Sequence, residues 1–163
     1  MGDPLIALLL DGLDEAFDKK SWHGTNLRGS LRGVRAQQAV WKLAPGRHSI
    51  WELALHAAYW KHVVRHRILG EQTTAFLLEG SNFFPRQEGT EKEWQLELLL
   101  LDSEHRGLRT AVAGLNPKLL DQVLSPKLTY AQIIRGAAAH DLYHAGQIQL
   151  LKRLYPSPRT KSS

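Results

Sequence analysis

Hydrophobic residues recur at steps of three and four along four long segments of the chain. The pattern is most regular between residues 90 and 116, where one seam alternates steps of four and three: Trp94, Leu98, Leu101, His105, Leu108, Val112 and Leu115. Such spacing places these residues on one face of an α-helix. The same periodicity predicts helices over 4–19, 49–69 and 129–154.

The expected helices also carry start and stop signals. The first has Asp3 as a cap and Pro4 at its first helical position. Gly70 marks the end of the second helix. The other three begin with a capping box, in which two side chains bond the free backbone N–H groups: Ser49 with Glu52, Thr90 with Glu93, and Thr129 with Gln132.

These patterns predict an all-α protein, because no segment shows the alternation with period two that marks a half-buried strand. Four amphipathic helices in one short chain bury their apolar faces against each other. We therefore expect a four-helix bundle over residues 1–154, with long connections between helices. Residues 155–163 have no apolar period and are expected to form a mobile C-terminal tail.

The connection over residues 71–89 is long for a bundle. Long connections often carry function or cover a site. Phe83 and Phe84 in this connection suit either a lid or a small satellite core, and the sequence leaves both roles open.

Composition narrows the chemistry. The chain has 163 residues, 43% of them hydrophobic and 23% charged, as in an ordinary soluble globular domain. It has no cysteine, so any metal must be bound by nitrogen or oxygen. Neither a signal peptide nor an apolar stretch of the ~18 residues that a membrane helix needs is visible. A cytoplasmic location, away from the membrane, is expected.

A formal charge of +5 and a pI of about 9.6 raise the question of nucleic acid. The basic residues are scattered, however, and two of them, Arg159 and Lys161, lie in the expected tail. No helix-turn-helix, zinc-finger or aromatic RNA-binding signature is present. We therefore expect a solvated basic surface and no nucleic-acid partner.

Two histidines of the last helix, His140 and His144, are four residues apart, so their Cβ atoms lie roughly 5–6 Å apart on one face. They share this face with apolar residues such as Ile133 and Ile148, which predicts that they point into the core. Burial of an unpaired imidazole costs roughly 1–3 kcal/mol. A shared metal ion or ordinary hydrogen bonds would satisfy the pair.

His56 occupies the inward stripe of the helix over 49–69. Three imidazoles, two from one helix and one from another, match catalytic metal sites that leave a position open for water or substrate. The histidines at 62 and 66 are also four residues apart, but they fall among Lys61, Arg65 and Arg67. We therefore expect His62 and His66 on the solvent-exposed face.

Three segments resemble the DinB/YfiT-like superfamily: Ser-Trp-His-Gly at 21–24, the histidine-bearing helix start at 48–60, and His-Asp-Leu-Tyr-His-Ala-Gly-Gln-Ile at 140–148. The resemblance implies a four-helix bundle in which His56, His140 and His144 bind a divalent metal, nickel or zinc in most cases. It also implies a homodimer as a frequent assembly. Relatives of this kind include thiol-dependent transferases and isomerases, hydrolases, and stress-associated proteins without an assigned activity.

Five further residues are candidates for the pocket or for holding the ligands. Asp141 adjoins His140 and either orients a ligand or faces solvent. Gln147 lies one turn beyond His144 and could bond it, and Tyr143 could line the pocket or pack in the core. His105 is either near the metal or a core histidine, and His23 lies in a turn that could approach the site.

A divalent ion held by three neutral ligands lowers the pKa of a bound water or thiol. The sequence thus predicts a metal-dependent enzyme for a small-molecule substrate, either a hydrolase or a thiol transferase with a small-molecule thiol cosubstrate. A pocket for a bulky thiol with cationic residues would favour transfer, and a small pocket with a carboxylate base would favour hydrolysis. The alternative is a non-catalytic, stress-associated bundle with a structural or adventitious metal.

Overall fold

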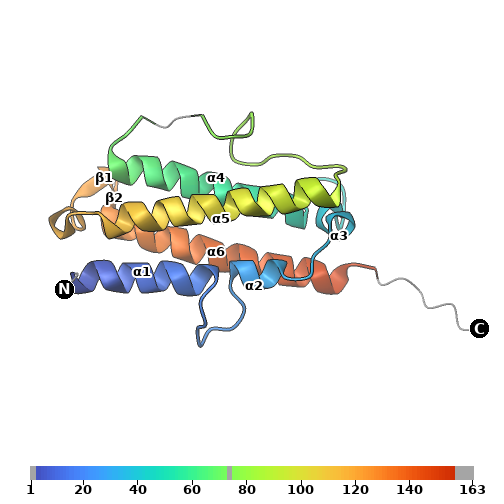
Figure 1. The fold of residues 1–163 in the computed structure, drawn as a ribbon, viewed down its shortest axis with the longest axis horizontal. Helices are drawn as coiled ribbons and strands as arrows, with labels where there is room; N and C mark the ends of the chain where they lie inside the picture. Colours follow the sequence, from blue (N-terminus) through green and yellow to red (C-terminus); the bar gives the residue numbers. More distant parts are fainter. Residues whose placement is uncertain (1–2, 73–74, 157–163) are drawn as a thin grey trace, which may run out of the picture.

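The structure is a computed structural model that describes residues 3–72 and 75–156. Four long helices lie side by side along one axis (Figure 1): α1 (Pro4–Phe17), α4 (Ile50–Leu69), α5 (Glu91–Ala113) and α6 (Tyr130–Leu154). The short helices α2 (Leu27–Leu31) and α3 (Ala36–Val40) follow α1, and α2 packs on α6 beyond the end of α1. The predicted all-α bundle is confirmed.

The helix ends form where the capping signals predict them. All three capping boxes are present, with both reciprocal hydrogen bonds in each. The Asp3 side chain accepts hydrogen bonds from the first two free N–H groups of α1, those of Leu5 and Ile6. Helix α4 ends at Gly70, whose φ of 67° is the left-handed conformation that favours glycine.

The connection between α5 and α6 contains a small hairpin that the pattern does not predict. A 3-10 turn, η1 (Pro117–Leu119), precedes two antiparallel strands, β1 (Val123–Ser125) and β2 (Leu128–Thr129). Strands of three and two residues are too short for an alternation of period two to be visible. The hairpin closes one end of the bundle and leads directly into α6.

The core consists of two packed clusters along the bundle axis. The cluster near α3 includes Trp51 and Trp94, whose ring centroids are 5.1 Å apart. The Trp94 indole N–H donates to the Val34 carbonyl over 2.8 Å, so the buried ring keeps a partner for its polar atom. The seam predicted for α5 is buried from Trp94 to Val112, including His105.

The prediction that His62 and His66 lie on the solvent-exposed face is wrong, since both side chains are buried. Helix α4 packs on α5 and α6, and ring contacts with Phe76 show that the 71–89 connection covers it as well. The Nδ1 atom of His62 lies 3.4 Å from a carboxylate oxygen of Glu104 of α5, and the Nδ1 atom of His66 lies 3.1 Å from a carboxylate oxygen of Glu71. Polar residues on this side of α4 are therefore buried with polar partners, which a one-helix pattern does not reveal.

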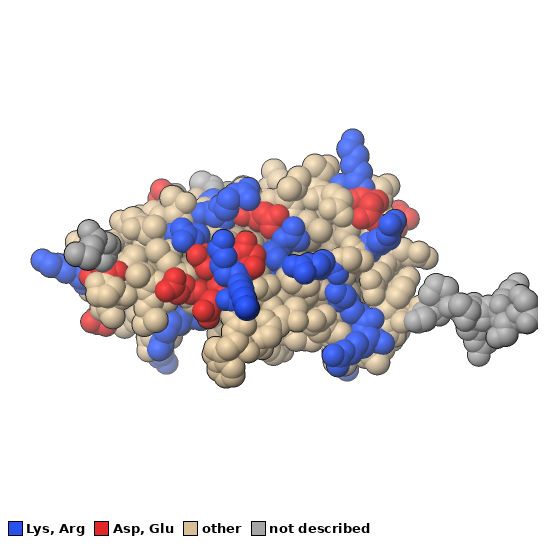
Figure 2. Space-filling view, turned by 60° about the horizontal axis from the view of Figure 1, so that its bottom comes forward, with Lys and Arg blue, Asp and Glu red and all other residues tan. Residues whose placement is uncertain are grey.

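The surface charge is mixed. On the face shown in Figure 2, Lys and Arg side chains are spread over the surface and Asp and Glu side chains lie among them. Among the helices of the described residues, none has the length and hydropathy needed to span a membrane.

The end of α6 runs into the predicted tail. Tyr155 still packs on the bundle, with its ring edge-on to Trp41 at a centroid distance of 5.7 Å. Residues 157–163 of the predicted mobile tail lie outside the described residues. The homodimer stays a prediction.

Candidate metal centre

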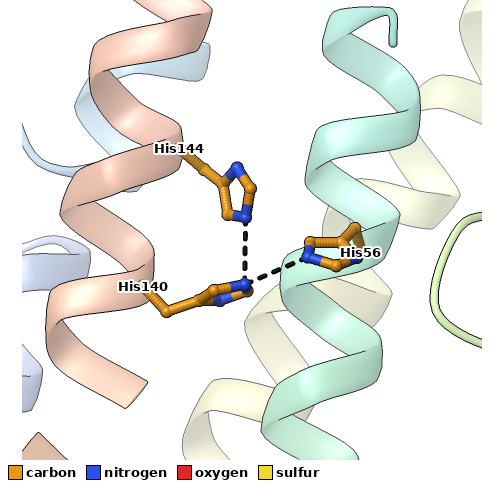
Figure 3. Close-up of side chains that lie close together, drawn as sticks. All are labelled: His56, His140 and His144. Atoms are coloured by element: carbon orange, nitrogen blue, oxygen red, sulfur yellow. Dashed lines mark hydrogen bonds between the residues drawn. The ribbon is translucent and has the colours of Figure 1, made fainter. Parts of the chain in front are cut away.

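Three histidines from two helices converge between α4 and α6. Figure 3 shows His56 of α4 facing His140 and His144 of α6. The His140 Nε2 atom lies 3.0 Å from the Nε2 atoms of both other rings. The candidate ligand atoms of all three lie within 4.8 Å of one another, so one ion could contact all of them.

The outer nitrogens of two of these rings are held by hydrogen bonds. His56 Nδ1 lies 2.8 Å from the Asn82 carbonyl oxygen, which only accepts, so Nδ1 carries the proton. His144 Nδ1 lies 2.6 Å from Gln147 Oε1 and donates in the same way. Each neutral ring therefore presents its Nε2 lone pair to the centre.

This arrangement fits a divalent ion. With His56 and His144 both unprotonated at Nε2, a proton on His140 Nε2 could satisfy only one of them well. Metal–nitrogen bonds of about 2.0–2.1 Å in a tetrahedral site place ligand nitrogens roughly 3.3 Å apart. The Nε2 separations of 3.0 Å are close to that spacing.

The three imidazoles are neutral near pH 7. Burial first, and then the neighbouring His144 and His56, lower the pKa of His140 to about 3. Burial likewise lowers the pKa of His144 to about 4, against the opposing hydrogen bond to Gln147. Burial also lowers the pKa of His56. The neutral form is the one that binds a metal.

The 71–89 connection covers one side of the centre. The Phe83 ring lies between two imidazoles, stacked on His56 at a centroid distance of 4.0 Å and on His48 at 3.6 Å. Asn82, which holds His56 through its carbonyl, also accepts a hydrogen bond from the Trp60 indole over 3.0 Å. Phe84 is buried in the core. Phe84 therefore belongs to the main core and not to a satellite core, whereas the role of Phe83 as a lid stays a prediction.

A buried ion pair lies next to the histidines. Lys61 of α4 donates to Asp141 of α6, and the two side chains are 2% and 1% exposed. Burial raises the pKa of Asp141, and the Lys61 charge opposes this shift. Of the two predicted orientations of Asp141, the one toward solvent is wrong. Its carboxylate is directed across the bundle to Lys61 and not to one of the three histidines, and this cation offsets part of the cost of burying it.

A cavity of about 470 Å³ opens beside the centre, between α4 and α6. Its size is within the range of small-molecule sites. The polar groups at its inner end are those of His56, His140, Lys61 and Asp141. The apolar side chains in its wall include Val64, Ile133 and Ala137.

The structure places the other four predicted site residues at different distances from the three histidines. Gln147 bonds His144, as the spacing suggested. Tyr143 is 65% exposed, so core packing is wrong for it, although its ring lies 5.1 Å from that of His144. His105 stacks on Phe17 of α1 at a centroid distance of 3.7 Å, and His23 is exposed in the α1–α2 connection. The cavity wall does not include Tyr143, His105 or His23, so a pocket-lining role is wrong for Tyr143 as well.

Sequence reasoning missed Asn82 and Lys61. Asn82 holds His56 through its backbone carbonyl, which any residue has, and its φ of 65° lies in the left-handed region that few residues other than glycine adopt. Lys61 follows the inward residue Trp60 in a basic stretch and has the sequence signature of a surface residue.

His105 makes the stability of the protein pH-dependent. Burial first, and then the charge of Lys61, lower its pKa to about 3, whereas an unfolded chain has a histidine pKa near 6.5. Between these values the unfolded chain binds the extra proton, so stability falls as the pH falls. We expect His105 alone to lower the free energy of unfolding by about 2 kcal/mol between pH 7.5 and pH 5.0.

The measurement is urea unfolding of the metal-free protein at both pH values. The comparison is with His105→Phe, which keeps an aromatic ring against Phe17. Its loss of stability over the same interval should be about 2 kcal/mol smaller. An equal loss in both proteins would show that His105 titrates normally.

Comparison with known proteins supports the resemblance to the DinB/YfiT-like superfamily. The family model of the DinB superfamily matches residues 21–148, which include all three histidines and the connection that covers them. None of the curated proteins matches the chain. The family match covers most of the sequence, and the chain therefore belongs to the DinB superfamily.

Proposed function

We propose that this protein is a metal-dependent enzyme in which His56, His140 and His144 hold a divalent ion that activates a small-molecule thiol or water. The observation that carries the proposal is the combination of three converging imidazole nitrogens with a cavity of about 470 Å³ beside them. Imidazole suits both nickel and zinc, and we expect one of these two ions.

Such an ion lowers the pKa of a thiol or water that reaches its open position. The chain supplies the positioning. Asn82 and Gln147 hold the rings of His56 and His144 with their Nε2 atoms inward. Phe83 covers the face of His56 and excludes solvent from that side. A reactant therefore approaches through the cavity.

The cavity supports thiol transfer better than hydrolysis. Hydrolysis benefits from a general base beside the attacking water. Among the described residues that line the cavity, Asp141 is the carboxylate, and Lys61 is already bonded to it. Arg67, which also lines this cavity, gives it a cationic residue of the kind expected for a thiol site.

A thiol with a pKa near 8.5 ionises without a strong base. In the transfer, the thiol releases its proton to solvent and the sulfur lone pair forms a carbon–sulfur bond with the electrophile. The leaving group departs with the electron pair of the bond that breaks.

The alternative is a structural or adventitious metal in a non-catalytic bundle. Structural zinc sites are closed by four protein ligands, whereas catalytic sites keep a position open. The described residues offer three ligands and an adjacent cavity, which favours catalysis.

The test is turnover by the metal-loaded protein. Pairs of a small thiol with an alkyl halide or epoxide form one panel, and esters and amides form the other. We expect at least one thiol pair to react, with activity lost in His140→Ala and kept in His23→Ala, a histidine on the exposed α1–α2 connection. If neither panel is turned over while removal of the metal lowers the melting temperature, the metal is structural.

A further inference from the structure

We infer that the cavity beside the histidines binds a small molecule with an apolar body and an anionic group, and that Arg67 at the rim binds the anionic group. The inference gives a ligand class to the cavity of the proposed enzyme. It rests on the proposed function for where the reactive end of the ligand lies, and its own test is equilibrium binding without turnover.

The charges of the cavity favour an anion. Lys61 and Asp141 neutralise each other at the buried end. Among the described residues, Arg67 has no ion-pair partner, and its guanidinium carbon lies over the Trp60 ring at 5.9 Å from the centroid. Arg67 is therefore the uncompensated cation of the cavity, and its planar guanidinium suits a bidentate contact with a carboxylate.

The position of Arg67 sets the orientation of the ligand. The Trp60 ring neighbours both Arg67 and the metal centre, since the Arg67 guanidinium carbon lies 5.9 Å from its centroid and the His56 ring centroid lies 6.4 Å from it. The distance from the Arg67 guanidinium carbon to the centre of the His56 ring is therefore at most the sum of 5.9 Å and 6.4 Å. A ligand whose anionic end contacts Arg67 reaches the histidines with its opposite end.

The wall between the two ends is apolar and leaves room for a ligand body. Val64, Ile133 and Ala137 line this part, and Gly136 of α6 lies at the exposed rim. A Cβ atom added to Gly136 would meet no atom within 4 Å. Because Gly136 lines the cavity, a larger side chain at this position fits without displacing a neighbour and narrows the opening. Leucine is also a better helix former than glycine.

The experiment is isothermal titration calorimetry of the full chain, metal-free and metal-loaded, with 2-naphthoate and its neutral analogue 2-naphthamide. We expect naphthoate to bind both forms at least tenfold more tightly than naphthamide. Arg67→Met should remove this preference and leave naphthamide affinity unchanged. Gly136→Leu should weaken both ligands at least tenfold.

The matched control is Gly12→Leu. Gly12 is also an exposed glycine inside a helix with no atom within 4 Å of an added Cβ, but it does not line the cavity. This variant should bind both ligands as the original chain does. Circular dichroism of each variant establishes that the bundle is intact.

The outcomes separate this inference from the proposed function. Equal binding of the two ligands, an anion preference that survives Arg67→Met, or affinity unchanged by Gly136→Leu would each overturn it. If naphthoate binds only the metal-loaded form and independently of Arg67, the carboxylate goes to the metal, and the enzyme proposal stands while the inference falls. If naphthoate binding depends on Arg67 but the metal-loaded protein turns over no substrate, the inference stands while the enzyme proposal falls.

Discussion

Replacing Lys61 with methionine is expected to lower the free energy of unfolding by about 3–5 kcal/mol. Methionine fills a similar volume, but it leaves the Asp141 carboxylate buried without its partner. Burial already raises the pKa of Asp141, and the loss of Lys61 raises it further. The folded variant then holds a proton that its unfolded chain releases, so the destabilisation grows as the pH rises. Urea unfolding at pH 5.5 and pH 8.0 measures both effects.

Two controls separate the buried charge from the lost contacts. The double variant Lys61→Met/Asp141→Leu has no charge to bury and should recover most of the stability. Arg28→Met breaks a partly exposed pair of similar type, in which Arg28 Nε lies 2.8 Å from Asp102 Oδ1. It should cost no more than about 1 kcal/mol. If Lys61→Met costs as little as Arg28→Met, the buried pair is not a strong determinant of stability.

The second large effect is expected at the metal centre. We expect the purified chain to take up about one nickel or zinc ion per molecule, since three nitrogens provide a nearly complete ligand set. Replacing any one of His56, His140 and His144 with alanine should weaken binding by more than the 10–100-fold that follows loss of an outer hydrogen-bond partner. Elemental analysis after dialysis gives the stoichiometry, and competition with a chelator gives the affinity.

The control for this series is His23→Ala, which removes an exposed histidine from the α1–α2 connection and should retain the full metal content. The metal assignment fails if the original chain binds no divalent ion after reconstitution. It also fails if His140→Ala binds one with unchanged affinity, because the Nε2 atom of His140 is the one in contact with both other rings.

The sequence alone determined the features that depend on residues close to one another in the same helix. Capping boxes involve residues three apart, so the starts of α4, α5 and α6 were predictable from the residues alone. The pair His140 and His144 followed from a spacing of four, and His56 from its apolar stripe. Their meeting across the bundle required only that α4 and α6 be neighbours.

The features that tertiary structure decided connect residues far apart in the chain. The Asn82 carbonyl holds a histidine 26 positions earlier, and Lys61 pairs with an aspartate 80 positions later. The burial of His62 follows from the α5 helix and from the loop that brings Phe76 over α4.

The physical reason is the range of the two kinds of signal. Helical periodicity reports which residues share a face, because it arises from contacts within one or two turns. It does not report how many neighbours cover that helix, and α4 is covered on several sides, so a basic stretch in it is buried along with its partners. Local spacing placed His56, His140 and His144 on inward faces. Packing decided that His62 and His66 are buried too, which backbone oxygen orients His56, which cation pairs with Asp141 and where a cavity remains.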